Sequence, residues 1–491
     1  MPSPPFAALP AAALLPLALL SACATVPKLG AAPQIATPAQ FDSRQTLAGA
    51  ATVTTWPAAD WWTGYGDTQL DALIAEALAG SPDLAAAAAR VRQADAYAEQ
   101  ANAARLPTLD ATGSVGAAKQ SYNNGIPAAF VPKGWNGTGQ LAANVGFDLD
   151  LWGRNRAAYA AARSEAEAAR LDFAQSSLML STNIADAYAD LARLFAERGV
   201  QQSALAIRQQ TESLTVDRVA SGLDTQAELK QARAAVPTAR ADLIATDEQI
   251  ALTRNRLASL LGKGPDRGLS IQAPAAIVPS RGIPQDVTTD LVGRRPDVVA
   301  ARSRVEAEAS RIKVARADFY PAINLSAAFG LQALGLGNLI KTGSTYGDAG
   351  PAVSLPIFRG GELQGRYRNA RATYDEAVAN YDRTVTDAYR QVGDAVTSRR
   401  SLASQLVEAR EALVQAQGAY DVARQRYEGG LSRFLDVLTA QDRALQAQRS
   451  FADLQARAFT LDVALVRALG GGFAAAPLPT DHQTSKDSSR G

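Results

Sequence analysis

Four short segments of the chain alternate between apolar residues and polar or small residues. From Leu141 to Leu151 every odd position is apolar, and three more segments follow the same rule: Leu109–Val115, Ile323–Leu331 and Ala349–Ile357. A period of two is typical of β-strands, and each segment with its flanks has about ten residues, enough for a tilted strand to cross a bilayer. One such strand alone would fit a soluble sheet equally well. Four of them predict two membrane hairpins, at about residues 107–151 and 321–358.

The rest of the chain is rich in helix-forming residues. Two long helices are expected from Arg156 to about Val219 and from Glu362 to about Glu428. At 1.5 Å per residue each would be on the order of 100 Å long. After a Gly-Leu turn, a second helix is expected to return from each of them, over Thr225–Leu261 and Arg433–Leu469.

This order of elements occurs twice in the chain. The segment that begins at Ser81-Pro82-Asp83-Leu84 and ends at Pro107 recurs, with the same length, from Arg295-Pro296-Asp297-Val298 to Pro321. Such self-similarity indicates a tandem duplication. We therefore predict a first repeat over residues 67–265, a linker over 266–284, a second repeat over 285–472 and a flexible tail over 473–491.

The N-terminus carries a predicted targeting signal. Residues 1–22 have the short apolar stretch and small residues of a signal peptide. The sequence Leu20-Ser21-Ala22-Cys23 resembles a bacterial lipobox, which implies that Cys23 becomes an acylated N-terminus and that residues 23–66 form a lipid-anchored arm. Ala24 points to the outer membrane rather than the inner one. The alternative is a buried structural cysteine.

Charge and composition exclude several classes of function. The formal net charge of +1 leaves no large basic surface for nucleic acid. The only histidine is His482 and the only cysteine is Cys23, so clustered zinc ligands and Ser-His or Cys-His catalysis are not expected. We predict no enzyme activity, no catalytic residue, no metal site and no cofactor apart from the covalent lipid.

The number of predicted strands requires more than one copy of the chain in a membrane. A closed transmembrane barrel needs at least about eight strands. An open sheet edge in lipid would leave backbone groups without hydrogen bonds. Two copies would supply eight strands and three copies would supply twelve.

Together these features resemble the outer membrane factor family, the TolC and OprM type of efflux channel, in its NodT-like lipoprotein branch. The resemblance rests on the segment Arg426–Gln441 and on Leu355-Pro356-Ile357-Phe358 at a strand exit. It implies a mainly α-helical fold with membrane β-structure: a long helical barrel as a periplasmic tunnel, and a transmembrane β-barrel with four strands per chain that is completed by a homotrimer.

The same resemblance implies the partners and the function. A periplasmic membrane fusion adaptor and an inner membrane RND-type pump would work with the channel, which would be a passive exit duct for drugs or other small toxic compounds. Two alternatives remain open: a duct for type I protein secretion, and a lipid-anchored periplasmic coiled coil without a pore.

The resemblance also implies two sets of functional residues at the far periplasmic end. Two matched turns would dock the adaptor: Arg218, Gly222, Leu223 and Arg426, Gly430, Leu431. Residues near these turns would form the periplasmic gate: Asp436 in a carboxylate ring, Tyr427 and the adjacent Arg433 as polar links, and Glu228 as their acidic partner. Ser432 and Thr439 stand where the family has a gate arginine and a second ring acid.

Overall fold

The computed structural model describes residues 26–37, 40–48, 52–53, 55–275 and 282–474. The predicted signal peptide and the lipid site at Cys23 lie outside the described residues. The chain divides into two compact units, each assembled from separate stretches of sequence. The first unit contains Val91–Ala169 and Ala301–Tyr381, and the second contains Ala36–Arg90, Arg170–Ala300 and the chain from Asp382 onward.

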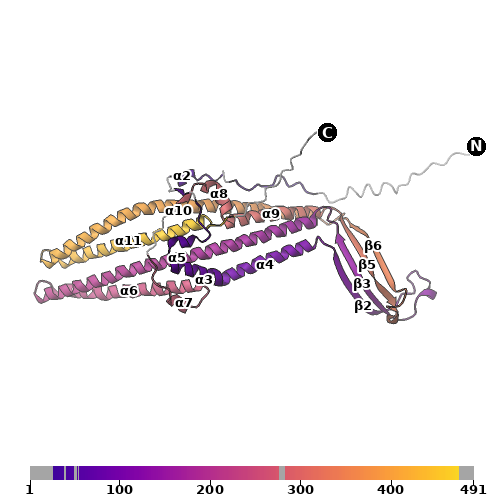
Figure 1. The fold of residues 1–491 in the computed structure, drawn as a ribbon, viewed down its shortest axis with the longest axis horizontal. Coiled ribbons are helices and arrows are strands. Elements are labelled where there is room, and N and C mark those ends of the chain that lie inside the picture. Colours follow the sequence, from indigo (N-terminus) through magenta and orange to yellow (C-terminus); the bar gives the residue numbers. More distant parts are fainter. Residues whose placement is uncertain (1–25, 38–39, 49–51, 54, 276–281, 475–491) are drawn as a thin grey trace, which may run out of the picture. The chain divides into compact units, whose positions relative to one another are not determined.

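The first unit contains an antiparallel sheet of four strands. These strands are β2 (Thr108–Ala118), β3 (Asn136–Asp148), β5 (Ala322–Leu334) and β6 (Thr345–Ser354). Their order across the sheet is β2-β3-β5-β6 (Figure 1). Both predicted hairpins are therefore present, joined along β3 and β5, and the edges of the sheet are β2 and β6.

Two of the strands end earlier than the alternation predicts. Apolar residues continue to Leu151 and Ile357, but β3 ends at Asp148 and β6 at Ser354. After β3 the backbone turns at Asp150, which has a positive φ of 48°. Its carboxylate accepts hydrogen bonds from the backbone N–H groups of Asn155 and Arg156, at 2.9 and 3.0 Å. Asp150 thus ends the strand because it caps the next helix.

The helices occur in pairs of equal length, one in each half of the chain. Helices α4 (Pro82–Ala103) and α9 (Pro296–Ala317) have 22 residues, α5 (Arg154–Ala220) and α10 (Glu362–Glu428) have 67, and α6 (Gln226–Leu260) and α11 (Phe434–Ala468) have 35. The bounds of the long helices agree with the predicted ones within two residues. In the second unit, α6 runs back beside α5 and α11 beside α10 (Figure 1). The tandem duplication is confirmed.

Several short elements complete the chain. They are α2 (Arg44–Leu47), β1 (Thr52–Val53), the 3-10 helix η3 (Trp61–Tyr65), α3 (Thr68–Gly80), α7 (Asp266–Leu269), β4 (Ile283–Pro284) and α8 (Val287–Arg294), with two 3-10 turns, η4 (Ala128–Phe130) and η5 (Leu336–Asn338). Among the described residues, no single helix is both long and apolar enough to cross a membrane; α3 and α4 meet those limits only as a bent pair.

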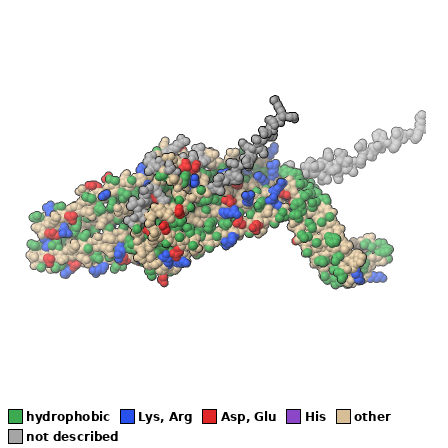
Figure 2. Space-filling model, in the orientation of Figure 1, with side chains coloured by type: hydrophobic (Ala, Val, Ile, Leu, Met, Phe, Trp, Pro, Cys, Tyr) green, Lys and Arg blue, Asp and Glu red, His purple; other side chains and the backbone are tan. Residues whose placement is uncertain are grey.

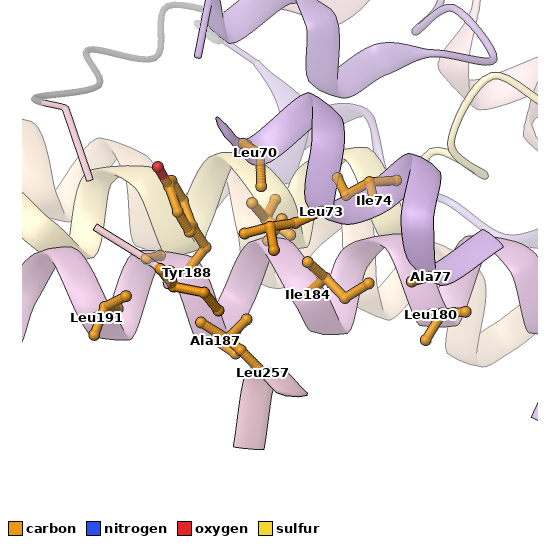
Figure 3. Packing of buried hydrophobic residues seen from close by; sticks show 14 of the residues in the cluster. Leu70, Leu73, Ile74, Ala77, Leu180, Ile184, Ala187, Tyr188, Leu191 and Leu257 are labelled. Carbon is orange, nitrogen blue, oxygen red and sulfur yellow. The ribbon is translucent and has the colours of Figure 1, made fainter. Parts of the chain in front are cut away.

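The core of the second unit forms where α3 packs across α5 and α6. Apolar side chains of α3 face Ile184 and Ala187 of α5 and Leu257 of α6 (Figure 3). Tyr188 is fully buried in the same cluster and donates a hydrogen bond of 2.8 Å to Asp67, the N-cap of α3. Because the N-cap residue also holds the tyrosine, the start of α3 is fixed against the long helix.

Candidate functional site at the helix turns

The turn between α5 and α6 is a Schellman motif. Gly222 has a φ of 66°, and its N–H donates to the carbonyl of Val219 at 3.1 Å. The N–H of Leu223 donates to the carbonyl of Arg218 at 2.9 Å. These two bonds satisfy carbonyl groups at the end of α5, and the left-handed conformation at their centre favours glycine.

The turn between α10 and α11 has the same backbone geometry. Gly430 has a φ of 73°, and its N–H donates to the carbonyl of Tyr427 at 3.0 Å. The N–H of Leu431 donates to the carbonyl of Arg426 at 2.7 Å. The two glycines that the sequence predicts at the turns therefore occupy equivalent positions.

The two predicted gate acids both cap the helices that follow the turns. Glu228 accepts a hydrogen bond of 2.5 Å from the N–H of Thr225, the N-cap of α6. Asp436 accepts one of 3.0 Å from the N–H of Arg433, the N-cap of α11. A carboxylate in the first turn of a helix is stabilised by the free N–H groups there.

Between the two turns lies a group of three side chains, Arg218, Asp224 and Tyr427, which we call the turn cluster. The Arg218 guanidinium donates to both carboxylate oxygens of Asp224, at 3.0 and 3.3 Å. It also donates to the carbonyl of Tyr427 at 2.7 Å, and its central carbon lies 4.2 Å from the centre of the Tyr427 ring. The Tyr427 hydroxyl donates to Asp224. The cluster therefore links the first turn to the second.

Burial and charge act together on the turn cluster. The Tyr427 ring is fully buried against Phe434, with the ring centres 6.0 Å apart. Burial raises the pKa of Tyr427 to about 12, and the Asp224 carboxylate adds to this rise. Burial also favours the neutral form of Asp224, but hydrogen bonds from Arg218 and Tyr427 outweigh it and lower the pKa of that carboxyl group. The cluster is thus a charged pair with a neutral tyrosine at neutral pH.

The predicted tip residues divide into exposed and buried ones. Leu223 and Leu431 are 64% and 73% exposed, and Arg426 is also exposed. The side chain of Arg218 is only 10% exposed because it lies in the turn cluster. The two leucines therefore expose apolar side chains to a binding partner at both turns. Of the two arginines, only Arg426 is exposed in the same way.

The structure differs from the sequence prediction in the acidic partner of Tyr427. Glu228 is predicted in that place, but within the chain the acidic residue that accepts from the Tyr427 hydroxyl is Asp224, which was not among the predicted site residues. Glu228 and Arg433 instead take part in the caps at the starts of α6 and α11. An Arg and an Asp on opposite sides of a Gly-Leu turn were the available signal for Asp224.

A second functional region is the sheet of the first unit, which has one apolar and one polar face. Residues at odd positions pair across the strands, as in Leu141 with Leu331, and many are exposed: Leu109, Val115, Leu141, Val145, Leu325, Phe329 and Val353. At even positions Asn144 donates to Thr112. Hydrophobic side chains gather over the sheet, and charged ones over the helices (Figure 2).

The described residues contain no metal-binding cluster. No group of three or more His, Cys, Asp or Glu side chains among them is placed to hold a metal ion.

Comparisons with known sequences relate the chain to export proteins. The sequence model described as "Outer membrane efflux protein" matches residues 73–263 and 288–471. The chain is 37% identical to the fusaric acid resistance protein FusA of Burkholderia cepacia over 65% of this chain and 60% of that protein. It is 30% identical to the multidrug resistance outer membrane protein MdtP of Escherichia coli K12 (94% and 95%), and 32% identical to the pyoverdine export outer membrane protein OpmQ of Pseudomonas putida (94% and 97%).

Solved structures show the same fold. The outer membrane protein VceC of Vibrio cholerae superposes with a TM-score of 0.81 at 44% identity, over 85% of this chain and all of that one. The outer membrane channel OprN gives a TM-score of 0.82 at 26% identity, over 91% and 99%. The predicted fold class, long helices with a four-stranded sheet per chain in the architecture of these channels, is confirmed.

Proposed function

The chain belongs to the outer membrane efflux protein family, and we propose that it is the passive exit duct of a tripartite efflux system. The family places it in the outer membrane. FusA, MdtP and OpmQ are named for fusaric acid resistance, multidrug resistance and pyoverdine export. We therefore propose drugs or other small organic compounds as the exported molecules. A duct of this kind needs no catalytic step.

The observation that carries the proposal is the sheet with one exposed apolar face and two open edges. An apolar face of exposed alternating residues is suited to lipid. The edges β2 and β6 run in opposite directions, so β6 of one copy can pair with β2 of the next in antiparallel fashion. Three copies would give a closed ring of twelve strands. We propose a homotrimer, anchored in addition by a lipid on Cys23.

We propose that the two helix turns are the docking points for a periplasmic membrane fusion adaptor. The exposed Leu223 and Leu431 support this, because an apolar side chain at the tip of a helical hairpin has no partner within its own hairpin. Arg426 adds a free positive charge beside one of them. An inner membrane RND-type pump would supply the energy through that adaptor.

We propose that the turn cluster holds the periplasmic gate closed. It joins the two hairpins of a subunit through Arg218, Asp224 and Tyr427. Opening would require these contacts to separate. Glu228, Asp436 and Arg433 would act at the same end, with three Asp436 carboxylates facing a common axis and favouring bound cations.

The test is assembly and conductance of the purified chain. We expect an unboiled sample to migrate as a trimer in a denaturing gel, and to form channels in planar bilayers. In a strain without its own channel, co-expression with a matching adaptor and pump should restore drug resistance. If the protein migrates as a monomer with or without boiling and gives no conductance, the proposal is contradicted and the coiled coil without a pore is favoured.

A further inference from the structure

A groove of about 600 Å³ lies in the first unit, between the start of α5 and the end of α9. Its size falls within the range of roughly 300–1,000 Å³ that is usual for sites of small ligands. Every charged side chain that lines it is a cation: Arg156, Lys313 and Arg316. Trp152 and Tyr320 line it as well. We call this feature the basic groove.

Two of the three cations are free to bind a ligand. Arg156 pairs with Asp150 at 3.2 Å. Lys313 and Arg316 are exposed and form no ion pair with any residue that the structure describes. They are three residues apart on α9, so they project from the same face of that helix. Two unpaired cations on one side of a groove without a carboxylate favour an anionic ligand.

The aromatic residues of the groove lie directly beyond the ends of the strands. Trp152 follows β3 by four residues, and Tyr320 precedes β5 by two. The two rings stack with their centres 4.7 Å apart, and the Trp152 Nε1–H donates to the carbonyl of Pro321 at 2.7 Å. Half-exposed tryptophan and tyrosine at this position are typical of the border between lipid and water.

The groove opens on the same side as the apolar face of the sheet. Arg154 lies near Asp148, at 3.7 Å, and Asp148 is an even position on the polar face. Arg156 is two residues further along α5, about 200° around the helix. It therefore points away from the polar face and into the groove. A ligand in the groove would lie next to the lipid that covers the apolar face.

The basic groove lies beside the two inner strands of the sheet, away from the edges where another copy of the chain would pair. Helix α5 follows β3, and helix α9 precedes β5. These are the two inner strands of the sheet, whereas another copy would pair at the edges β2 and β6. The groove is thus accessible to lipid in a trimer.

We propose that the basic groove binds the phosphate of an anionic glycerophospholipid from the periplasmic leaflet, an inference that rests on the proposed membrane function. Lys313 and Arg316 contact the phosphate. Trp152 lies beside the glycerol and the upper part of an acyl chain. The ligand fixes the depth of the channel at the end of the sheet where the helices begin.

The experiment measures lipid binding to the purified full chain by native mass spectrometry. The detergent-solubilised protein is titrated with phosphatidylglycerol or with zwitterionic phosphatidylcholine. We expect the wild type to prefer phosphatidylglycerol, and the double variant Lys313→Gln, Arg316→Gln to bind it roughly thirtyfold more weakly, since each cation near an anionic lipid contributes a factor of about five. A matched control, Arg240→Gln with Lys263→Gln, removes the same charges from exposed positions in the second unit and should bind as the wild type does.

Three outcomes would overturn the inference. They are equal binding of both lipids by the wild type, unchanged binding by the double variant, and displacement of phosphatidylglycerol by an equal concentration of inorganic phosphate, which would indicate a site for the free ion. Conductance in phosphatidylcholine bilayers separates this inference from the proposed function. If wild type and double variant conduct equally but show no lipid preference, only the groove inference fails; if neither conducts, the channel proposal fails.

Discussion

The two helix turns have the same backbone and different side chains. Both have a glycine with positive φ, the same pair of turn hydrogen bonds, and an acid that caps the next helix. Ser432 stands in the second turn where the first has Asp224, and Val219 stands in the first where the second has Tyr427. Each turn therefore carries only part of the cluster that joins them.

This difference indicates which residues both copies of the turn needed to keep after the duplication. The residues that satisfy the turn's own backbone are needed in both copies, because each turn would otherwise leave carbonyl and N–H groups without partners. The residues that join the turns are needed once, since a donor on one turn requires an acceptor on the other. Arg218 and Asp224 stand on the first turn and Tyr427 on the second, so one copy of each is enough for this contact.

The largest expected effect is the loss of the buried arginine. Arg218→Ala should leave the buried carboxylate of Asp224 without its charged partner, and cost about 1.5–3 kcal/mol, as for hydrogen bonds to charged groups. Hydrogen exchange measured by mass spectrometry should quicken in peptides from both turns. The equivalent Arg426→Ala should change local stability by less than about 0.5 kcal/mol, because Arg426 is exposed. Equal effects at the two positions would show that the turns are not joined as described.

Replacement of the turn glycine should have the next largest effect, and the same effect at both turns. A valine at Gly222 or Gly430 would force a β-branched residue into the left-handed region, at about 1–2 kcal/mol. An added Cβ would meet no atom within 4 Å at either position, so the cost is one of backbone strain alone. We expect each single change to abolish drug resistance while the trimer level in the membrane stays at the wild-type value. Unchanged resistance in either variant would remove that turn from the docking surface.

A smaller effect is expected from the tyrosine hydroxyl. Tyr427→Phe keeps the ring under Arg218 but removes the hydrogen bond to Asp224, a loss of about 0.5–1.5 kcal/mol. Open probability in planar bilayers should rise, and it should rise further when Glu228→Ala is added. Tyr97→Phe, on an exposed tyrosine of α4, is the matched control and should have no effect. Wild-type conductance in the double variant would place the gate elsewhere.

The smallest expected effect is that of a pH change near neutrality on the turn cluster. The pKa of Asp224 is lowered, so its contribution is present above the ordinary value of 3.8 and is lost as the pH falls through the lower folded value. The pKa of Tyr427 is raised to about 12, so its contribution is present below 10 and is lost as the pH rises toward 12. Titration of Asp224 and Tyr427 should therefore leave the open probability unchanged between about pH 5 and 9. A marked change at pH 6–7 would require a different titrating group.

Much of the fold follows from local patterns in the sequence. Period-two alternation located all four strands, and runs of helix formers located the long helices, because both are repeated over many residues. The strand end at Asp148 was missed since apolar residues continue to Leu151, while the turn depends on one side chain, Asp150, that bonds to the next helix. The boundaries of the repeats and of the linker stay predictions, as does the lipid on Cys23.

The site was predictable only in part. Gly222 and Gly430 were identifiable because a Gly-Leu turn between helices has a local signature, and because it occurs twice. The pairing of Asp224 with Arg218 has a local signal across the turn, but its contact with Tyr427 has none, since Tyr427 lies 203 residues away and no spacing rule connects the two. Local sequence patterns thus predict the two turns. The contact between the turns depends on how the two helical hairpins pack, which no local pattern predicts.

The equal lengths of the paired helices constrain how this gene can change. One residue inserted into α5 alone would carry its turn about 1.5 Å further and rotate it by about 100° relative to the turn after α10. Arg218 would then no longer face Tyr427. A tolerated change in length would have to occur in both halves at once, and in steps of about seven residues, which is close to two whole helical turns. Insertions and deletions among homologous genes should therefore come in matched pairs.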